Sequence, residues 1–415
     1  MTANWAVRAV SGENGGVRES PIPVAVRPDA AAKRSLIVLI VLTVLVHMVF
    51  NGSRITISLY ALRLGAAPAT VGMLLGLFGA LPMLLSVTTG RVIDRIGVRR
   101  PMITGALMAS AGALSVPLFP GLAVLFVAAV LIGAGFMLFQ IAQQNAAGYI
   151  GRPDQRAMNF SLTALGFSAS NLLGPLLAGT LIDQIGPVWT FAAIGWLPLV
   201  TAACLARGIP DLPALPASLT TERRRLGELL AHGELRFIFL STGLVAMAWD
   251  LYGFVMPIYG SHIGLSATRI GVVISMFALA TFLVRLVMPL ILHRMNAWQM
   301  LRLALAVSAL VYFLFPFTSQ TSLLMVLSFV LGFGLGSAQP MVMALLHAKT
   351  PEGRVGEAVG LRSMLINTSQ TGLPLMFGVL GSALGMTPVF WTLAALQFIG
   401  CELIRRHQKH ERAAR

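Results

Sequence analysis

Charged side chains are scarce in this sequence. Of its 415 residues only 11% are Asp, Glu, Lys or Arg, whereas about 25% is usual for a soluble domain. Hydrophobic residues make up 56% of the chain, so too few polar side chains remain to cover a fold of this size in water. The composition excludes a chain of soluble globular domains and predicts a polytopic membrane protein.

Cysteine is nearly absent too, since the chain has only two, Cys204 and Cys401. Two cysteines exclude a disulfide framework or a cysteine-rich metal site. No group of His, Asp and Glu has metal-ligand spacing, no phosphate-binding loop is present, and no catalytic groups cluster near one interface. We therefore predict no metal, no cofactor and no enzymatic activity, and we exclude an intrinsic ATP-driven pump.

What the chain does have is a series of long apolar runs, each of about 18 residues or more, which is the length that a helix needs to cross a bilayer. They lack the alternating pattern of a membrane barrel, and a helix satisfies its own backbone hydrogen bonds in lipid. The sequence therefore predicts an all-α integral membrane protein. The twelve predicted transmembrane helices are 36–62, 69–89, 101–120, 122–147, 157–182, 188–207, 237–260, 269–291, 299–317, 321–346, 356–381 and 388–404.

Basic residues gather on one side of these spans. They lie in the head, in alternate loops and in the tail, and the other side has only Arg63 and Arg269. By the positive-inside rule both termini and the middle loop are cytoplasmic. The net charge of +15 is then explained by topology, and we expect no nucleic-acid partner. We expect a multi-pass protein of the cytoplasmic (inner) cell membrane.

The two halves of the chain are related in sequence. The series Asn51, Tyr60, Gly65, Gly72 recurs 199 positions later as Asp250, Tyr259, Gly264, Gly271. A duplicated six-span unit of this kind is typical of transporters with a substrate site between the halves. The predicted segments are a disordered cytoplasmic head (1–34), an N-terminal six-helix bundle (35–207), a cytoplasmic linker (208–236), a C-terminal six-helix bundle (237–405) and a cytoplasmic tail (406–415).

A specific motif follows the second span, where the chain reads GRVIDRIGVRRP. Its matching positions are Gly90, Asp94, Arg95, Gly97, Arg99 and Arg100. This spacing resembles the signature loop of the major facilitator superfamily (MFS). The resemblance implies two pseudo-symmetric six-helix bundles (the MFS fold) that rock to give alternating access, with this loop as a gate latch. The alternative is a basic loop that only sets topology.

The fifth span carries a second motif, formed by Gly166, Gly174, Pro175 and Gly179. It is similar to the glycine- and proline-rich motif of exporters (antiporters) in the same superfamily. Ordinary close packing of transmembrane helices is the alternative. Drug/proton antiporters often have an arginine in the fourth span, but Ala129 occupies that place here, so the proton relay of those antiporters is not carried over.

Ionisable residues inside a membrane are costly and are functional candidates by default. Asp250 is the one acid well inside a span, and we predict that it couples transport to protons. Arg54 is expected to face it across the pathway, so that protonation of Asp250 would release Arg54 to bind an anion; a static buried salt bridge is the alternative. Arg285 resembles an arginine of anion carriers in the superfamily, unless it only snorkels to the interface. For Arg362, nearer the interface, we expect a structural role.

Polar and aromatic residues complete a candidate substrate-binding site, although similar side chains also serve in helix packing. The remaining candidates are Asn51, Gln140, Gln144, Asn367 and Gln370, with Trp249 and Tyr252 as stacking surfaces.

Together these features predict a secondary transporter that exports a small anionic or zwitterionic organic molecule by proton-coupled antiport. Proton-coupled uptake of an organic acid by a symporter is the alternative, and a non-transporting polytopic membrane protein is a remote one. The expected partners are the small-molecule substrate, protons and the lipid bilayer, and we expect a monomer.

Overall fold

The computed structural model describes residues 29–152, 155–212, 233–292, 295–350 and 355–413. Most of the predicted head and linker lie outside these ranges. Within them the chain forms eleven α-helices and one 3-10 turn, and no strand. The helices are α1 (Asp29–Arg63), α2 (Pro68–Ile96), α3 (Arg99–Leu118), α4 (Leu122–Tyr149), α5 (Arg156–Ala206), α7 (Gly233–His262), α8 (Ala267–Leu292), α9 (Ala297–Leu314), α10 (Thr321–Lys349), α11 (Val355–Leu384) and α12 (Met386–Ala413).

Helix α5 has 51 residues, more than twice the roughly 20 that cross a bilayer. It turns back at Gly186, which has a φ of 81° and is followed by Pro187. A positive φ is readily adopted only by glycine, so α5 is two spans joined by a sharp bend. With this bend the described helices account for the twelve predicted spans, and the predicted fold class is confirmed.

The apolar character of the helices agrees with that count. Ten helices are long and apolar enough to cross a membrane, and α5 is one of them. The helix missing from the ten is α11, which contains the polar residues Asn367 and Gln370. We expect the polar face of such a span to point toward the protein rather than toward lipid, because polar groups in hydrocarbon need partners within the protein.

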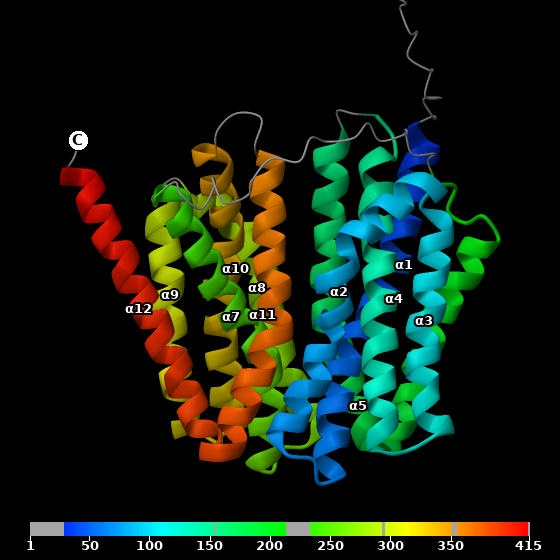
Figure 1. The fold of residues 1–415 in the computed structure, drawn as a ribbon, viewed down its shortest axis with the longest axis horizontal. Coiled ribbons are helices and arrows are strands. Elements are labelled where there is room, and N and C mark those ends of the chain that lie inside the picture. Colours follow the sequence, from blue (N-terminus) through cyan, green and yellow to red (C-terminus); the bar gives the residue numbers. More distant parts are fainter. Residues whose placement is uncertain (1–28, 153–154, 213–232, 293–294, 351–354, 414–415) are drawn as a thin grey trace, which may run out of the picture.

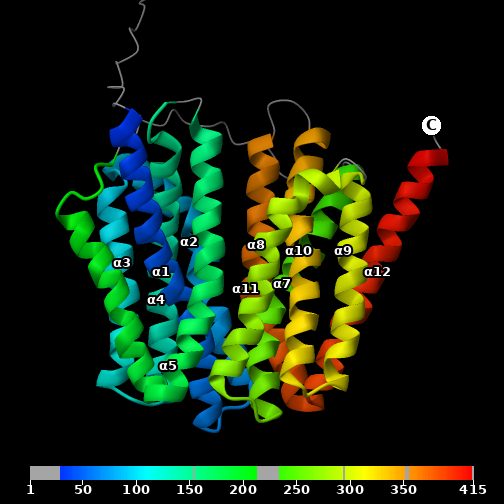
Figure 2. The ribbon, with the colours of Figure 1, turned by 180° about the vertical axis from the view of Figure 1, so that it is seen from behind.

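The helices form two groups that lie side by side, α1 to α5 and α7 to α12 (Figures 1 and 2). Each group packs around buried apolar side chains, such as Phe191 in the first and Phe254 and Tyr312 in the second. The main contacts between the groups join α2 to α11 and α5 to α8. We name the end of the molecule where α1 begins and α12 ends the terminal end; the groups lie closest at the opposite, closed end (Figure 1).

The contacts at the closed end occur as a related pair. A Cβ on Gly271 would stand 2.5 Å from the carbonyl oxygen of Pro175, and a Cβ on Gly72 would overlap the carbonyl oxygen of Pro374. Gly72 and Gly271 are 199 positions apart, and so are Pro175 and Pro374. The duplication seen in the sequence therefore produces the same helix–helix contact twice, with glycine at each closest approach.

Helix ends at the closed end are capped across the two groups. The carboxylate of Asp183 accepts hydrogen bonds from the backbone N–H groups of Ala267 (3.0 Å) and Thr268 (2.7 Å) at the start of α8. The hydroxyl oxygen of Ser382 accepts one from the N–H of Ala69 (2.9 Å) at the start of α2. The first N–H groups of a helix have no partner within it. Each group of helices thus supplies a hydrogen-bond acceptor for the free N–H groups at a helix N-terminus of the other group.

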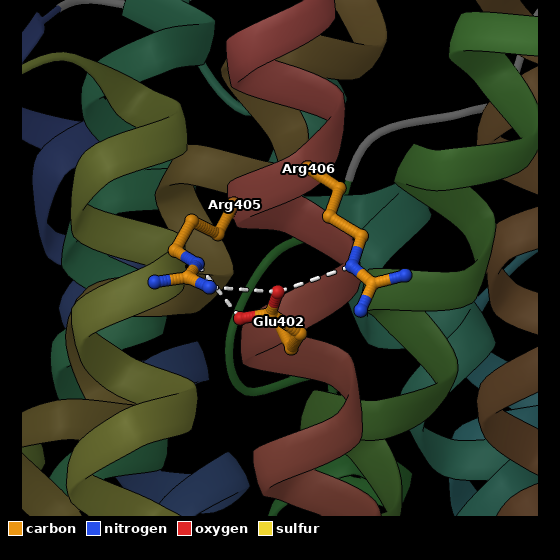
Figure 3. Close-up of polar contacts among 3 residues, drawn as sticks. All are labelled: Glu402, Arg405 and Arg406. Atoms are coloured by element: carbon orange, nitrogen blue, oxygen red, sulfur yellow. Dashed lines mark hydrogen bonds and ion pairs between the residues drawn. The ribbon is translucent and has the colours of Figure 1, made fainter.

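Two helices extend beyond their predicted apolar spans. Helix α1 begins at Asp29, before the expected start at residue 36, and α12 continues to Ala413. At the end of α12, Glu402 Oε2 lies 2.7 Å from Arg405 Nε, and Glu402 Oε1 lies 3.1 Å from Arg406 Nε (Figure 3). Residues three and four positions apart are neighbours on a helix surface, so these ion pairs support helix past the last apolar turn.

We expect Gly72→Ala and Gly271→Ala each to depopulate the conformation seen here. The added methyl group would push into a backbone carbonyl, and overpacking of this kind costs about 1–3 kcal/mol. Spin-label or cross-linking distances at the closed end would therefore lengthen between α2 and α11 in Gly72→Ala and between α5 and α8 in Gly271→Ala. Gly243→Ala is the matched control, because a Cβ there meets nothing within 4 Å. Equal distances in all three variants would contradict this account of the closed end.

Candidate functional site

One pocket lies between the two groups of helices, and we name it the interface pocket. It has a volume of about 590 Å³, which includes its open mouth. It is lined by Asn51, Arg54 and Ile55 of α1, Asn171 and Pro175 of α5, Trp249, Asp250, Tyr252 and Gly253 of α7, and Ile274, Phe277 and Ala278 of α8.

Arg54 and Asp250 face this pocket from different groups of helices. Asp250 is buried, with 4% of its surface exposed, and the two charges attract each other across the interface. The guanidinium carbon of Arg54 lies 5.9 Å from the ring centroid of Phe50, an arrangement that favours a cation. The predicted pair is thus brought together. The Asp250 Oδ2 atom nevertheless accepts no hydrogen bond from any residue that the structure describes.

An amide pair forms one wall of the interface pocket. The Asn51 side-chain nitrogen donates to the Asn171 side-chain oxygen at 2.8 Å, which joins α1 to α5. Asn51 was predicted as a binding residue, whereas Asn171 was not. The sequence feature that could have identified Asn171 is an amide side chain within an otherwise apolar run, because such a group needs a hydrogen-bond partner in the membrane.

Aromatic residues form the opposite wall. The Tyr252 ring stacks on Phe277 with 4.6 Å between centroids, and Trp249 meets Phe277 edge-on at 4.8 Å. The Tyr252 hydroxyl lies 2.8 Å from Ser328 Oγ and 3.2 Å from the carbonyl oxygen of Val273. Tyr252 therefore offers its ring to the pocket, while its hydroxyl is held by α8 and α10.

A second pocket, which we name the α7–α11 groove, continues from the other side of Asp250. Its volume is about 430 Å³ including its mouth. Trp249 and Asp250 line both pockets, and Gln370 of α11 lies here as predicted. The groove is lined by Thr242, Val245, Ala246, Trp249 and Asp250 of α7, Gln339 and Val342 of α10, and Arg362, Ile366 and Gln370 of α11.

The groove also contains two residues outside the predicted substrate site. Gln339 has no counterpart among the predicted site residues, and for Arg362 the sequence predicts a structural role. A charge within the eleventh apolar run was the available signal for Arg362. Its position near the start of the apolar run suggested that Arg362 lies close to the membrane–water interface. Its position against α7 and α10 could not be read from the sequence.

Other predicted residues lie outside these two pockets. The Arg285 Nη1 atom donates to Ser168 Oγ at 2.7 Å, which connects α8 to α5 between the groups. On α4, Gln144 is exposed and Gln140 is half-buried. Asn367 is half-buried on α11. Their role in substrate binding stays a prediction.

The signature loop caps α2 and contacts the chain beyond α5. Gly97 follows α2 with a φ of 83°, and its N–H donates to the Ile93 carbonyl oxygen at 2.9 Å. Arg99 Nη2 donates to the Pro210 carbonyl oxygen at 3.1 Å. Arg95 and Arg100 are exposed. The Asp94 side chain lies outside the described part of the chain, so the latch stays a prediction.

Comparison with known families decides what this architecture is. Residues 39–237 and 238–414 each match the family model described as Major Facilitator Superfamily. The chain belongs to the Major Facilitator Superfamily. The resemblance drawn from the loop motif is confirmed, and the protein is a multi-pass membrane transporter of this superfamily.

Relatives of known name match a part of the chain. The multidrug resistance protein MdtH of Yersinia pestis (strain Pestoides F) is 31% identical over 141 residues, which are 32% of this chain and 35% of that protein. MdtH of Yersinia pseudotuberculosis serotype O:1b (strain IP 31758) matches equally. The matched segment thus spans about a third of the length of these curated relatives.

Solved structures match almost the whole fold. A peptide transporter, POT, in complex with sulfate has a TM-score of 0.76 at 16% identity, covering 91% of this chain and 94% of that one. A bacterial homologue of the human lysosomal transporter Spinster, inward-facing and unoccupied, has a TM-score of 0.72 at 14% identity, covering 92% and 99%. These likenesses establish the fold.

We expect Tyr252→Phe to lower stability, because it leaves the buried Ser328 hydroxyl without its partner. Such a loss costs on the order of 1 kcal/mol. A double-mutant cycle with Ser328→Ala, measured by reversible unfolding of the full chain in mixed micelles, would show coupling between the two hydroxyls. Tyr60→Phe is the control, since the Tyr60 hydroxyl has no hydrogen bond to a described residue. Additive effects of Tyr252→Phe and Ser328→Ala would argue against the hydrogen bond.

Proposed function

We propose that this transporter exports small anionic or zwitterionic organic molecules across the cytoplasmic membrane in exchange for protons. The observation that carries the proposal is the position of Asp250. One buried carboxylate lines both pockets and faces Arg54 of the other group of helices. A carboxylate inside a membrane protein is costly to keep charged without a partner, so its state of protonation affects every group around it.

In this proposal Asp250 exchanges partners during the cycle. When it is deprotonated, its charge attracts Arg54 and holds α7 near α1. When it binds a proton, that attraction is lost and Arg54 becomes available to an anionic group of the solute. Because the two side chains belong to different groups of helices, the exchange changes how strongly the groups attract each other. A ligand that binds two conformations unequally shifts the balance between them.

The orientation follows from the charge distribution. We propose that the terminal end is cytoplasmic, because the basic clusters lie there. The conformation seen here would then be closed to the outside, at the contacts of Gly72 with Pro374 and of Gly271 with Pro175. The signature loop lies at the opposite end and would latch the alternate conformation.

Two observations support export rather than uptake. The relatives matched over part of the chain are named multidrug resistance proteins. The glycine- and proline-rich segment of α5 also packs directly on its neighbours. A Cβ on Gly174 would stand 3.0 Å from the Met48 carbonyl oxygen, and one on Gly179 would stand 2.5 Å from that of Ala267. This segment therefore contacts both α1 and α8. Close packing suits either direction of transport, so the support for export comes from the resemblance of the motif to that of exporters.

We expect Asp250→Asn to abolish solute-driven proton movement. In everted membrane vesicles with an acidified lumen, addition of organic acids and amino acids to the wild type should release protons, recorded with a fluorescent pH probe. The amide of Asp250→Asn cannot bind a proton in this range, so the release should disappear. Arg54→Gln should weaken the response to anionic solutes by about tenfold, because charge-assisted hydrogen bonds are the strong ones.

Glu402→Gln is the matched control, since it removes a half-buried acid near the end of α12 that lines neither pocket. It should leave the response unchanged. A full response in Asp250→Asn would refute the coupling role. Solute accumulation in right-side-out vesicles on external acidification, without accumulation in everted ones, would instead establish uptake by symport.

A further inference from the structure

The α7–α11 groove has opposite charges at its two ends. On α7 it extends from Thr242 to Asp250, and on α11 from Arg362 to Gln370. Eight residues of helix rise roughly 12 Å. Both helices start at the terminal end, so Arg362 lies toward that end and Asp250 lies deeper. A cation and an anion therefore mark opposite ends of one elongated pocket.

Both charged groups have a buried atom without a partner. Neither Asp250 Oδ2 nor Arg362 Nε makes a hydrogen bond with any residue that the structure describes. Buried polar atoms are satisfied in the large majority of cases, and leaving one unsatisfied is costly, even though the Asp250 carboxylate as a whole also has Arg54, Gln370 and Ser369 around it. Two such atoms of opposite charge in one pocket indicate a ligand that satisfies both.

The wall between the two charges is mainly apolar. It consists of Val245, Ala246 and Trp249 on α7, Val342 on α10 and Ile366 on α11. Polar side chains occur near the ends, with Gln370 beside Asp250. The surface is thus suited to a solute whose two charged groups are separated by a hydrocarbon spacer.

We propose that the α7–α11 groove binds an extended zwitterion, with its carboxylate on Arg362 and its ammonium group on Asp250. The planar guanidinium of arginine matches a carboxylate in two parallel hydrogen bonds, and the spacer packs on Trp249 and Val342. This inference rests on the proposed function and names its substrate class. For a zwitterion the anionic end goes to Arg362 rather than Arg54, and the ammonium group takes the place of the proton on Asp250.

Binding of simple ω-amino acids to the full chain in lipid nanodiscs tests the groove. The probes are γ-aminobutyrate, ε-aminocaproate and ω-aminocaprylate, with hexanoate and hexylamine as compounds that carry one charge. Calorimetry should show that affinity depends on chain length. It should also show that ε-aminocaproate binds at least about tenfold more tightly than either singly charged compound, since each charge-assisted contact adds separately.

Substitutions then show which charged group of the ligand binds at which end of the groove. Arg362→Gln should reduce ε-aminocaproate affinity to that of hexylamine and leave hexylamine binding unchanged. Asp250→Asn should reduce it to that of hexanoate. Arg302→Gln on α9 is the control, an arginine of the same group of helices that does not line the groove, and should bind as the wild type does. If Arg362→Gln fails to fold, Arg362→Lys should fold and still lose about tenfold, because lysine lacks the planar fork.

The inference is overturned if ε-aminocaproate binds Arg362→Gln as it binds the wild type, or if affinity is independent of chain length. The same holds if none of the probes binds. Proton release recorded in vesicles separates this failure from that of the proposed function. Asp250-dependent release with other solutes and no binding of ω-amino acids would reject the groove alone. Binding without any proton movement would reject proton coupling and leave the groove in place.

Discussion

A charged side chain within a bilayer must find its electrostatic partner inside the protein, because lipid offers neither hydrogen bonds nor screening. This constraint explains why so few charges occur in the spans and why those that do lie against the pockets or between the groups of helices. Asp250 is the strongest case, since its burial at 4% exposure leaves Arg54 as the nearest opposite charge across the interface. The two pockets meet at this residue, and this position is why we propose that its partner links solute binding to conformation.

The duplicated six-span unit produces related contacts in the two halves of the molecule. The contact of Gly72 with Pro374 and that of Gly271 with Pro175 are copies of one arrangement. The same helix–helix contact therefore occurs twice at the closed end, once between α2 and α11 and once between α5 and α8. The interface pocket does not share this symmetry, because Asn51 of α1 corresponds to Asp250 of α7 and both line it. A symmetric scaffold therefore surrounds an asymmetric pocket, with the acid of this pair in only one half.

Much of the fold could be predicted from the sequence, because hydropathy and the positive-inside pattern respond to the bilayer itself. The bend at Gly186 was anticipated as a boundary between two spans, although the backbone remains helical on both sides. For the candidate site, charge within a span and the pairing of positions between the halves singled out Arg54 and Asp250, which both line the interface pocket. The direction of a side chain around its helix cannot be read from the sequence, and this is why the position of Arg362 in the α7–α11 groove could not be predicted. Gln140 and Gln144 were grouped by helical spacing alone, which fixes a shared face but not what that face contacts.

The caps at the closed end differ in one respect. Asp183 holds the start of α8 with a carboxylate and two hydrogen bonds, whereas Ser382 holds the start of α2 with a hydroxyl and one. Hydrogen bonds to a charged acceptor are roughly twice as strong as those to a neutral one. The contact between α5 and α8 thus has the stronger cap. We expect any separation of the two groups of helices at the closed end to begin between α2 and α11, where the cap is weaker.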